Sequence, residues 1–306
     1  MILRQVKNKV ETLLLKGKVV SDTIRSSLRL RVKALKEVDI VPQLAAIIIG
    51  EDPASQVYVK NKARAFEKLQ CKSQTFKLEA DSDEQKVLEL IDTLNQDHKV
   101  HGILVQLPLP SHWDSKKILH RVYPEKDVDG FHPQNLGLLL EGNPNFIPCT
   151  PHGILEILKY YNISISGQHA VIVGRSNIVG KPLFALLSQK FEIGNATVTI
   201  CHTGTKDLTV HVKQADIIIA AAGTPNMITG EMVKEGVDIV DVGINRVNDD
   251  SEKGYKLVGD VNTKSVMGIA HSVTPVPGGV GPMTITMLLS NTVLSAEKFL
   301  KLETAD

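Results

Sequence analysis

Short apolar runs that alternate with helical segments constrain the fold of this chain most strongly. PQLAAIIIGE (42–51) and VHGILVQLPLP (100–110) are continuously apolar, as expected of strands covered on both faces, and CKSQTFKLEA (71–80) is a further predicted strand. Helical periodicity is predicted over 53–69, with Pro53 near the start, and over 83–96. Repeated strand–helix–strand units favour a parallel sheet with helices on its faces.

Length and charge narrow the class of protein. With 306 residues, the chain is long enough for two domains of about 150 residues each. Its 35 basic and 34 acidic residues leave a net charge of +1, so neither nucleic acid nor an anionic membrane is expected as a partner. No apolar run approaches the ~20 residues that span a bilayer. The first eighteen residues are Lys-rich, whereas transit peptides are rich in Arg and Ser. Their Leu run is too short for the apolar core of a secretory signal peptide. We therefore expect a cytoplasmic protein.

Several common kinds of site find no support in the sequence. Cys71, Cys149 and Cys201 lie far apart and form no CxxC pair, which predicts neither a disulfide framework nor a zinc site. The ten histidines show no HExxH or other metal-ligand spacing, so no metal is assigned. No G-x-S-x-G elbow is present, and a serine hydrolase is therefore not indicated.

The second half of the chain carries a nucleotide-binding pattern. HAVIVGRSNIVGKPLFALL (169–187) predicts a strand, a glycine-containing turn and a helix. Its spacing, Gly174-x-Ser176-x-x-x-Gly180, departs from G-x-G-x-x-G, and a purely structural strand–turn–helix is a comparable explanation. Further strands predicted at 196–202, 215–223 and 237–245 have the spacing of a doubly wound dinucleotide fold.

The end of the second of these strands indicates the cofactor. An NAD site would place an acid there, about 20 residues beyond the turn, to bind the ribose hydroxyls. This chain has Cys201, His202 and Thr203 instead. Arg175 in the turn, with His202 and Thr203, could hold a 2′-phosphate, which favours NADP over NAD.

Two loops differ in composition from the rest. Residues 127–151 are rich in Gly, Pro and Asn, and we interpret them as a connection between domains. Asp127 and Asp129 within this segment are an isolated pair of carboxylates, for which a solvated turn is expected. Residues 275–282 hold three glycines and three prolines, which favours a functional loop over a simple helix start.

Tyr58 and Lys62 are candidates for chemistry because they lie four residues apart on a predicted helix and share a face. A lysine that carries protons near neutral pH must have its pKa lowered by burial or by neighbours. The same helix carries Lys60, Arg64 and Lys68, so a solvated amine is the alternative. In short-chain dehydrogenases a Tyr-x-x-x-Lys motif follows the glycine-rich turn, whereas here Tyr58 and Lys62 precede that turn. A short-chain dehydrogenase is therefore disfavoured.

Gln106 ends a predicted buried strand, at the edge of a parallel sheet where ligands usually bind. It could instead satisfy backbone groups at the strand end.

Together these segments resemble the bifunctional methylenetetrahydrofolate dehydrogenase/methenyltetrahydrofolate cyclohydrolase family. The resemblance runs in order over nearly the whole chain beyond about Leu13. The matching stretches are YVKNK (58–62), HGILVQLPLP (101–110), PEKDVDGFHPQNLG (124–137), PCTPHG (148–153), VIVGRSNIVGKP (171–182), GIN (243–245), GDV (259–261) and TPVPGGVGPMT (274–284).

The resemblance implies two α/β domains with a cleft between them that holds folate against nicotinamide. Residues 1–148 would form the folate-binding domain, completed by a C-terminal helix over 286–306. Residues 149–285 would form a Rossmann-like, doubly wound NADP-binding domain. It further implies two long helical connections, a homodimer and a role in one-carbon metabolism, which supplies purine biosynthesis. ADIIIAAAG (215–223) could present apolar surface for such a dimer.

The resemblance also implies a role for each matched residue. Lys62 matches the catalytic lysine, Tyr58 the ring that stacks on the folate, Gln106 the amide that positions the lysine, and Asp129 the carboxylate that binds the pterin. The remaining matched positions are Val105, Leu107, Pro277, Gly278, Gly279 and Val280 for the substrate, and Gly174, Arg175, Ser176, His202, Thr203 and Ile244 for the cofactor.

Three rival functions stay open from the sequence. A shikimate-type NADP dehydrogenase would explain the domain order but not KDVDG or PGGVGPMT. A protein that binds folate and NADP without turnover is disfavoured by the intact Lys62, Gln106 and Asp129. A dehydrogenase that lacks the hydrolytic step would have the same residues.

Overall fold

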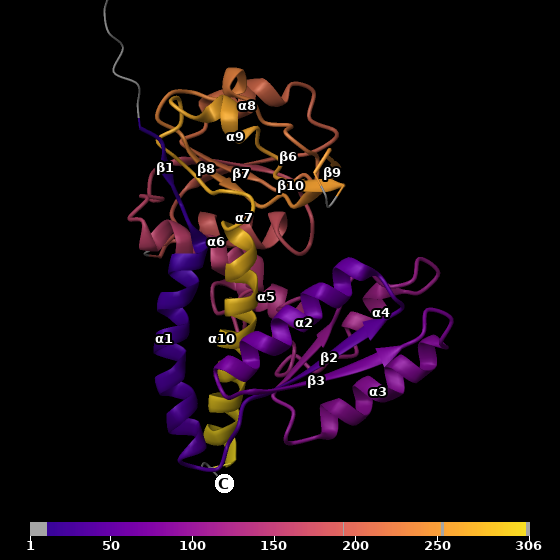
Figure 1. Cartoon of the computed structure of the whole chain (residues 1–306). Coiled ribbons are helices and arrows are strands. Elements are labelled where there is room, and N and C mark those ends of the chain that lie inside the picture. The colour runs from indigo at the N-terminus through magenta and orange to yellow at the C-terminus, as the bar shows by residue number, and fades with distance from the viewer. Residues whose placement is uncertain (1–10, 192, 252–253, 304–306) are drawn as a thin grey trace, which may run out of the picture. The chain divides into compact units, whose positions relative to one another are not determined.

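A computed structural model describes residues 11–191, 193–251 and 254–303 (Figure 1). The chain divides into two compact units. The three-stranded unit comprises residues 21–153 and the segment from 283, and the six-stranded unit comprises the segment up to residue 20 together with 154–282. The segment before about Leu13, which the family resemblance does not cover, lies largely outside the described residues.

A parallel sheet of three strands lies at the centre of the first unit. β2 (Gln43–Ile49) lies between β3 (Lys72–Leu78) and β4 (Gly102–Val105), which confirms the three strands predicted in the first half. In this register Leu44 lies opposite both Ser73 and Gly102. Every residue from Leu44 to Ile49 is buried, because helices cover both faces of the sheet.

Helices form the rest of the hydrophobic core of this unit. α2 (Pro53–Lys68) and α3 (Glu84–Gln96) are the helices predicted from periodicity. Val87 and Ile91 of α3 pack with Ile47 and Ile103 of the sheet. Two shorter helices were not predicted, α4 (Ser115–Leu119) and α5 (Pro133–Glu141).

The three-stranded unit is completed by most of α1 (Gly17–Lys36) and α10 (Val280–Glu303), which lie side by side (Figure 1). Ser21 Oγ and Thr286 Oγ1 are 2.8 Å apart, and Arg31 makes a bidentate pair with Glu297 at 2.7–2.8 Å. The Asn291 amide of α10 donates to the backbone oxygens of Val128 at 2.8 Å and Ile147 at 3.0 Å.

The sheet of the second unit has the order β1-β11-β8-β7-β5-β6, and each of its strand pairs is parallel. Its strands are β1 (Leu13–Leu14), β5 (His169–Val173), β6 (Thr197–Cys201), β7 (Ile217–Ala220), β8 (Asp238–Asp241) and β11 (Ser272–Val273). Counted from β5, the first four strands have the order 2-1-3-4, so the direction of winding reverses between β5 and β7. The predicted doubly wound parallel fold is confirmed.

The remaining elements of this unit are short. They are α6 (Cys149–Tyr160, shared with the first unit), α7 (Gly180–Ser188), α8 (Leu208–Gln214), the 3-10 turn η1 (Gly230–Met232), α9 (Thr263–Val266) and an antiparallel hairpin of β9 (Asn245–Asn248) and β10 (Tyr255–Val258). Neither the hairpin nor β1 was predicted. β1 joins the sheet through two residues, and Thr12 Oγ1 beside it donates to Ala270 O at 2.8 Å.

Two expectations about surfaces need correction. β7, at the core of ADIIIAAAG, lies between β5 and β8 and its four residues are at most 1% exposed, so it offers no apolar surface. Segment 127–151 was expected to be a connection between domains, but it contains α5 and the start of α6.

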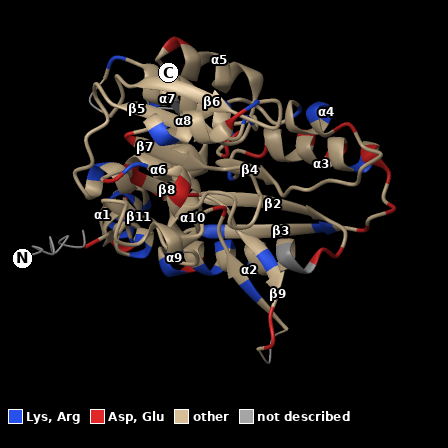
Figure 2. Ribbon diagram, turned by 90° about the horizontal axis from the view of Figure 1, so that it is seen from above, with Lys and Arg blue, Asp and Glu red and all other residues tan. Residues whose placement is uncertain are grey.

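Charge is unevenly distributed along the described chain. Lys and Arg outnumber Asp and Glu on both α1 and α2, and the basic residues of α2 stand out as blue stretches (Figure 2). None of the helices in the described part is both long and apolar enough to cross a bilayer.

Two helical glycines give a matched test of packing. A Cβ on Gly153 of α6 would lie 2.6 Å from Met283 Cβ, whereas a Cβ on Gly137 of α5 would meet nothing within 4 Å. Gly153→Ala should lower the free energy of unfolding by about 1–3 kcal/mol through overpacking. Gly137→Ala should raise it by up to about 1 kcal/mol through helix propensity. Urea denaturation followed by circular dichroism measures both, and equal shifts would contradict this packing.

Candidate active site

α2 places Tyr58 and Lys62 above the carboxyl edge of the three-stranded sheet. The chain leaves β2 through Gly50, and Asp52 then caps the helix by accepting a hydrogen bond from Ser55 N at 2.8 Å. The four-residue spacing brings Lys62 Nζ to 4.7 Å from the centroid of the Tyr58 ring. The predicted shared face is therefore formed.

Lys62 is buried and held by Gln106. Its side chain is only 5% exposed, while Lys60, Arg64 and Lys68 of the same helix are exposed, so the solvated-amine alternative is wrong for this lysine. Lys62 Nζ donates to Gln106 Oε1 at 3.1 Å. Burial lowers the pKa of Lys62 below its ordinary value, and the nearby Asp129 carboxylate opposes that effect. A neutral amine is thus more accessible here than at the surface.

The Gln106 amide is oriented by its own strand end. Its Nε2 donates to Leu107 O at 2.8 Å, which turns Oε1 toward Lys62, and its backbone N–H donates to Ile47 O at 2.9 Å. Gln106 directly follows Val105, the last residue of β4, which is 5% exposed. The side-chain amide therefore serves both the backbone and the lysine.

Asp129 and Cys149 form the acidic side of this site. Burial raises the pKa of Asp129, while the Lys62 ammonium and a hydrogen bond with the Cys149 thiol lower it. Cys149 is 2% exposed, and burial beside Asp129 holds the pKa of its thiol well above the usual range. Cys149 was not among the predicted site residues, because a lone cysteine in the sequence carries no sign of what it touches.

Tyr58 lies in the same cluster. Burial raises the pKa of its phenol to about 12, and a hydrogen bond with Thr284 acts in the opposite direction. Thr284 Oγ1 lies 3.0 Å from Thr150 Oγ1, which ties α10 to α6 next to the ring. Neither threonine was singled out from the sequence as an individual site residue.

Asp127 departs from the solvated turn expected for an isolated pair. It is 6% exposed, and its Oδ2 accepts from His132 N at 2.7 Å and from Asn135 Nδ2 at 2.8 Å. Burial nevertheless raises its pKa to about 6. These bonds fix the start of α5 and hold the segment that carries Asp129, so the two carboxylates have different tasks.

In the six-stranded unit, backbone segments approach each other closely where the winding reverses. Gly174, which follows β5, has a φ of +136°, and a Cβ on it would lie 2.2 Å from Ala221 O in the loop after β7. A Cβ on Gly180 would lie 2.1 Å from Gly174 O. Only glycine fits both places, and ligands of doubly wound sheets bind at this switch point.

Arg175 and His202 leave neighbouring strands at the same edge, because Gly174 N donates to Cys201 O at 2.8 Å. Arg175 is exposed, and its guanidinium makes no hydrogen bond or ion pair with the described residues. Ser176 Oγ accepts from Val179 N at 3.1 Å and Gly180 N at 3.4 Å, so this serine caps two backbone N–H groups at the start of α7.

The turn after β6 is compact. His202 Nδ1 accepts from Gly204 N at 3.0 Å, and His202 N donates to Thr205 Oγ1 at 2.9 Å. Thr203 is exposed in this turn, and no acid follows the strand. The geometry leaves a basic and hydroxyl-bearing rim.

Ile244 and the glycine-rich loop line one cavity of about 190 Å³ in this unit. Ile244 is 57% exposed, and the loop contributes Pro277, Gly278, Gly279 and Val280. Positions expected to contact the cofactor and positions expected to contact the substrate thus share a cavity. α10 begins at Val280, within this loop and before residue 286, where the C-terminal helix was expected to start.

Two buried carboxylates hold the loops around that cavity. Asp260 Oδ2 accepts from Ala222 N at 2.7 Å and Gly223 N at 2.8 Å, and its Oδ1 accepts from Asn245 Nδ2 at 2.8 Å. Asp241 accepts from the backbone N–H groups of Gly243, Asp260 and Val261, each at 2.9 Å. Burial raises the pKa of Asp241 to about 6. Sequence reasoning missed both roles, although GDV (259–261) contains Asp260.

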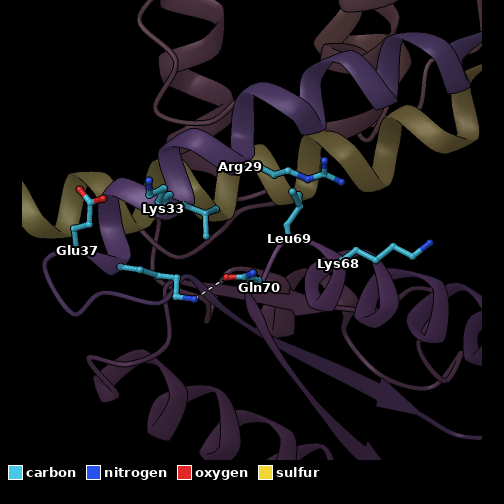
Figure 3. A pocket seen from close by; sticks show the side chains of 8 residues that line it. Arg29, Lys33, Glu37, Lys68, Leu69 and Gln70 are labelled. Carbon is cyan, nitrogen blue, oxygen red and sulfur yellow. Dashed lines mark hydrogen bonds between the residues drawn. The ribbon is translucent and has the colours of Figure 1, made fainter.

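A basic cavity of about 380 Å³ between α1 and the end of α2 is a weaker candidate. Its Lys33 and Lys68 lie in the last turns of these helices, where cations offset the helix dipole, and their side chains point in different directions (Figure 3). Lys36 donates to Gln70 Oε1 at 2.7 Å. The described residues contain no group of three or more His, Cys, Asp or Glu able to hold a metal.

Two family models match the chain. The NAD(P)-binding domain of tetrahydrofolate dehydrogenase/cyclohydrolase matches residues 148–300, and the catalytic domain of the same family matches residues 15–129. The "Bifunctional protein FolD" of Chlorobium chlorochromatii is 54% identical over 286 residues, which cover 92% of this chain and 97% of that protein. The protein of the same name from Moorella thermoacetica is 51% identical over 285 residues, with coverage of 93% and 99%.

Solved structures agree with the sequence matches. The FolD methylenetetrahydrofolate dehydrogenase/cyclohydrolase of Campylobacter jejuni is 49% identical with a TM-score of 0.87, covering 94% of this chain and 99% of that one. The Trypanosoma brucei enzyme, complexed with NADP cofactor and inhibitor, is 36% identical with a TM-score of 0.90, covering 95% and 99%. The matches to both domains and to full-length relatives decide against a shikimate-type enzyme, and the chain belongs to the tetrahydrofolate dehydrogenase/cyclohydrolase family.

Proposed function

We propose that this chain oxidises 5,10-methylenetetrahydrofolate to the 5,10-methenyl compound with NADP and hydrolyses that product to 10-formyltetrahydrofolate. The observation that carries the proposal is the buried Lys62 amine, held by Gln106 Oε1 at 3.1 Å beside Asp129. An amine that is buried, has a lowered pKa and donates to a single acceptor suits proton transfer, which binding without turnover does not require. Membership of the family and a relative complexed with NADP support both activities.

The six-stranded unit has the features that NADP requires. Gly174 lets backbone approach a ligand closely at the switch point, and the unpaired Arg175 suits a 2′-phosphate. The other proposed contacts are Ser176, His202, Thr203 and Ile244. When bound, NADP supplies the acceptor for the hydride that leaves the folate methylene carbon. For the hydride transfer, the chain itself needs only to align the two ligands.

The three-stranded unit provides the folate contacts. Asp129 is proposed to accept hydrogen bonds from the pterin amino and ring N–H groups, which suits a partly buried carboxylate. Tyr58 is proposed to stack on the folate. Further contacts are proposed from Val105, Leu107 and the loop Pro277, Gly278, Gly279 and Val280.

Lys62 is proposed to carry the proton in hydrolysis. Water attacks the methenyl carbon, and the neutral amine takes a proton from that water as the C–O bond forms. The resulting ammonium then returns that proton to the departing folate nitrogen as the carbon–nitrogen bond of the tetrahedral adduct breaks. The hydroxyl proton of the adduct is released to solvent as the formyl C=O forms. Gln106 orients the amine throughout, because its Oε1 accepts from Nζ.

Lys62→Met should lower the rate of hydrolysis at least about 100-fold, because no other proton carrier replaces the amine. NADP binding should be unchanged, since Lys62 belongs to the three-stranded unit. Incubation with methylenetetrahydrofolate or the methenyl compound, followed by an acid quench, measures methenyl and formyl products by absorbance. Lys60→Met, an exposed change on the same helix, is the matched control. Full hydrolysis by the Lys62 variant would remove the residue from the mechanism.

The pH dependence of hydrolysis tests the charge state of Lys62. Below its pKa the amine is protonated and accepts no proton, so the rate should rise with pH through a limb below the ordinary lysine value of 10.5. Asp129 raises the pKa of Lys62, so Asp129→Asn should move the limb to lower pH. Rates at saturating substrate over a pH series measure the limb. A limb that stays in place would argue against Lys62 as the titrating group.

Arg175→Ala should raise the KM for NADP about tenfold or more and that for NAD much less, since only NADP carries the 2′-phosphate. Initial rates with each cofactor measure this difference. Lys213→Ala removes an exposed cation from the same unit and should change neither KM. Equal effects of Arg175→Ala on both cofactors would place the 2′-phosphate elsewhere.

The organisation beyond the site completes the proposal. We assign folate binding to residues 1–148 with 286–306 and NADP binding to 149–285, in a cytoplasmic enzyme without a nucleic-acid partner. We also propose a homodimer. The outer strand β6 supports it, since Val198 and Ile200 are only partly buried and Phe184 and Phe191 are 39% and 40% exposed. Sedimentation velocity of the purified chain measures the assembly.

A further inference from the structure

A second cavity of the three-stranded unit lies at the opposite edge of its sheet from Lys62. Its volume is about 360 Å³, within the range of roughly 300–1,000 Å³ typical of small-molecule pockets. His101, which lines it, immediately precedes β4, whereas Gln106 immediately follows that strand. The last turns of α10 form the other wall, through Lys298, Phe299 and Lys301. The cavity is therefore distinct from the site proposed for folate.

Two lysines of this cavity lack a carboxylate partner among the described residues. Lys126 Nζ donates to Leu94 O at 3.0 Å and Asp97 O at 2.8 Å. Lys298 Nζ donates to Asn145 O at 2.9 Å and to Asn145 Oδ1. An ammonium has three N–H groups, so each lysine keeps one donor unused. Burial lowers the pKa of both amines, and the Asp97 carboxylate near Lys126 acts in the opposite direction without forming an ion pair with it.

His101 adds a third donor. Its side chain is 6% exposed, and burial beside Lys126 lowers its pKa to about 4, so the ring is neutral. Nδ1 accepts from Gln43 N at 3.2 Å, which leaves the ring hydrogen on Nε2. Within the described residues, no acceptor is found for this Nε2–H.

Phe299 gives the cavity a flat apolar wall. Its ring centroid lies 5.7 Å from that of His98 and 5.9 Å from that of His101, and the ring is only partly buried. Val100 lies beside it in the lining. An aromatic ring of a ligand can pack against this wall in an offset or edge-on geometry.

We propose that this cavity binds a small aromatic carboxylate. The carboxylate accepts from the unused N–H groups of Lys126, Lys298 and His101, and the ring of the ligand packs on Phe299. Glu125 and Lys301 also line the cavity. Glu125 is exposed, and three lysines to one glutamate leave the wall net positive, so an anion is favoured over a cation.

Titration of the full chain with 2-naphthoate by isothermal calorimetry tests the proposal. Saturable binding at one site is expected, weakened about tenfold or more by Lys298→Met and by Lys126→Met, since each removes a charge-assisted hydrogen bond. Lys298→Arg should restore most of the affinity. Lys116→Met, an exposed change in the same unit, should have no effect. The neutral 2-naphthamide should bind at least about tenfold more weakly than 2-naphthoate.

Two further measurements make the result decisive. Unchanged dehydrogenase and hydrolase rates in Lys298→Met and Lys126→Met show that these variants are folded. Unchanged 2-naphthoate affinity in Lys62→Met shows that the probe does not occupy the folate site. The proposal is overturned by the absence of saturable binding, by equal affinity in wild type and both cavity variants, or by loss of binding in Lys62→Met alone.

Discussion

The burial of one amine, that of Lys62, determines what must surround it. A lysine removed from water keeps its charge only if neighbours stabilise the charge, and otherwise its pKa falls. Gln106 supplies a neutral acceptor at 3.1 Å, and Asp129 supplies a partial counter-charge. Burial thus lowers the pKa of the amine while the Asp129 carboxylate opposes that effect, and the role proposed for Lys62 as a proton carrier depends on this balance. A carboxylate in place of Gln106 would favour the ammonium and abolish that balance.

The strand order of the sheet makes this arrangement possible. Because β2 lies between β3 and β4, the helix that follows β2 and the residue that follows β4 meet at one edge. α10 and α6 then close the site from distant parts of the sequence, through Thr284 and Cys149. In the six-stranded unit, the buried carboxylates of Asp241 and Asp260 have a comparable structural task. They accept main-chain N–H groups from loops at the carboxyl edge, and thereby fix the rim of the cavity that Ile244 lines.

The parts of the structure that the sequence predicted are those governed by local pattern. β2 is a continuous apolar run because both of its faces are buried. α2 and α3 show a helical period because each buries one face, so the hydrophobic pattern predicts all three elements. β1 was missed because two residues carry no period, and it forms only where Ser272 and Val273 offer a partner strand. The different tasks of Asp127 and Asp129 were not predictable, since His132, Asn135 and Cys149 decide them. The family resemblance identified Lys62 as a candidate, but only the packed structure distinguishes it from the exposed Lys60 and Lys68.

Comparison of Lys62 with Lys126 and Lys298 shows that a lowered pKa does not by itself indicate catalysis. All three amines are desolvated, and none has an ion-pair partner among the described side chains. Lys126 and Lys298 each donate to two fixed acceptors, so their direction is set by the fold and they serve as static donors. Lys62 donates to a single amide oxygen and lies beside Tyr58 and Asp129, which leaves two of its N–H groups without an acceptor among the described residues. The number of acceptors that the protein supplies, rather than burial, thus distinguishes Lys62, proposed to exchange protons, from the two lysines proposed to bind a ligand.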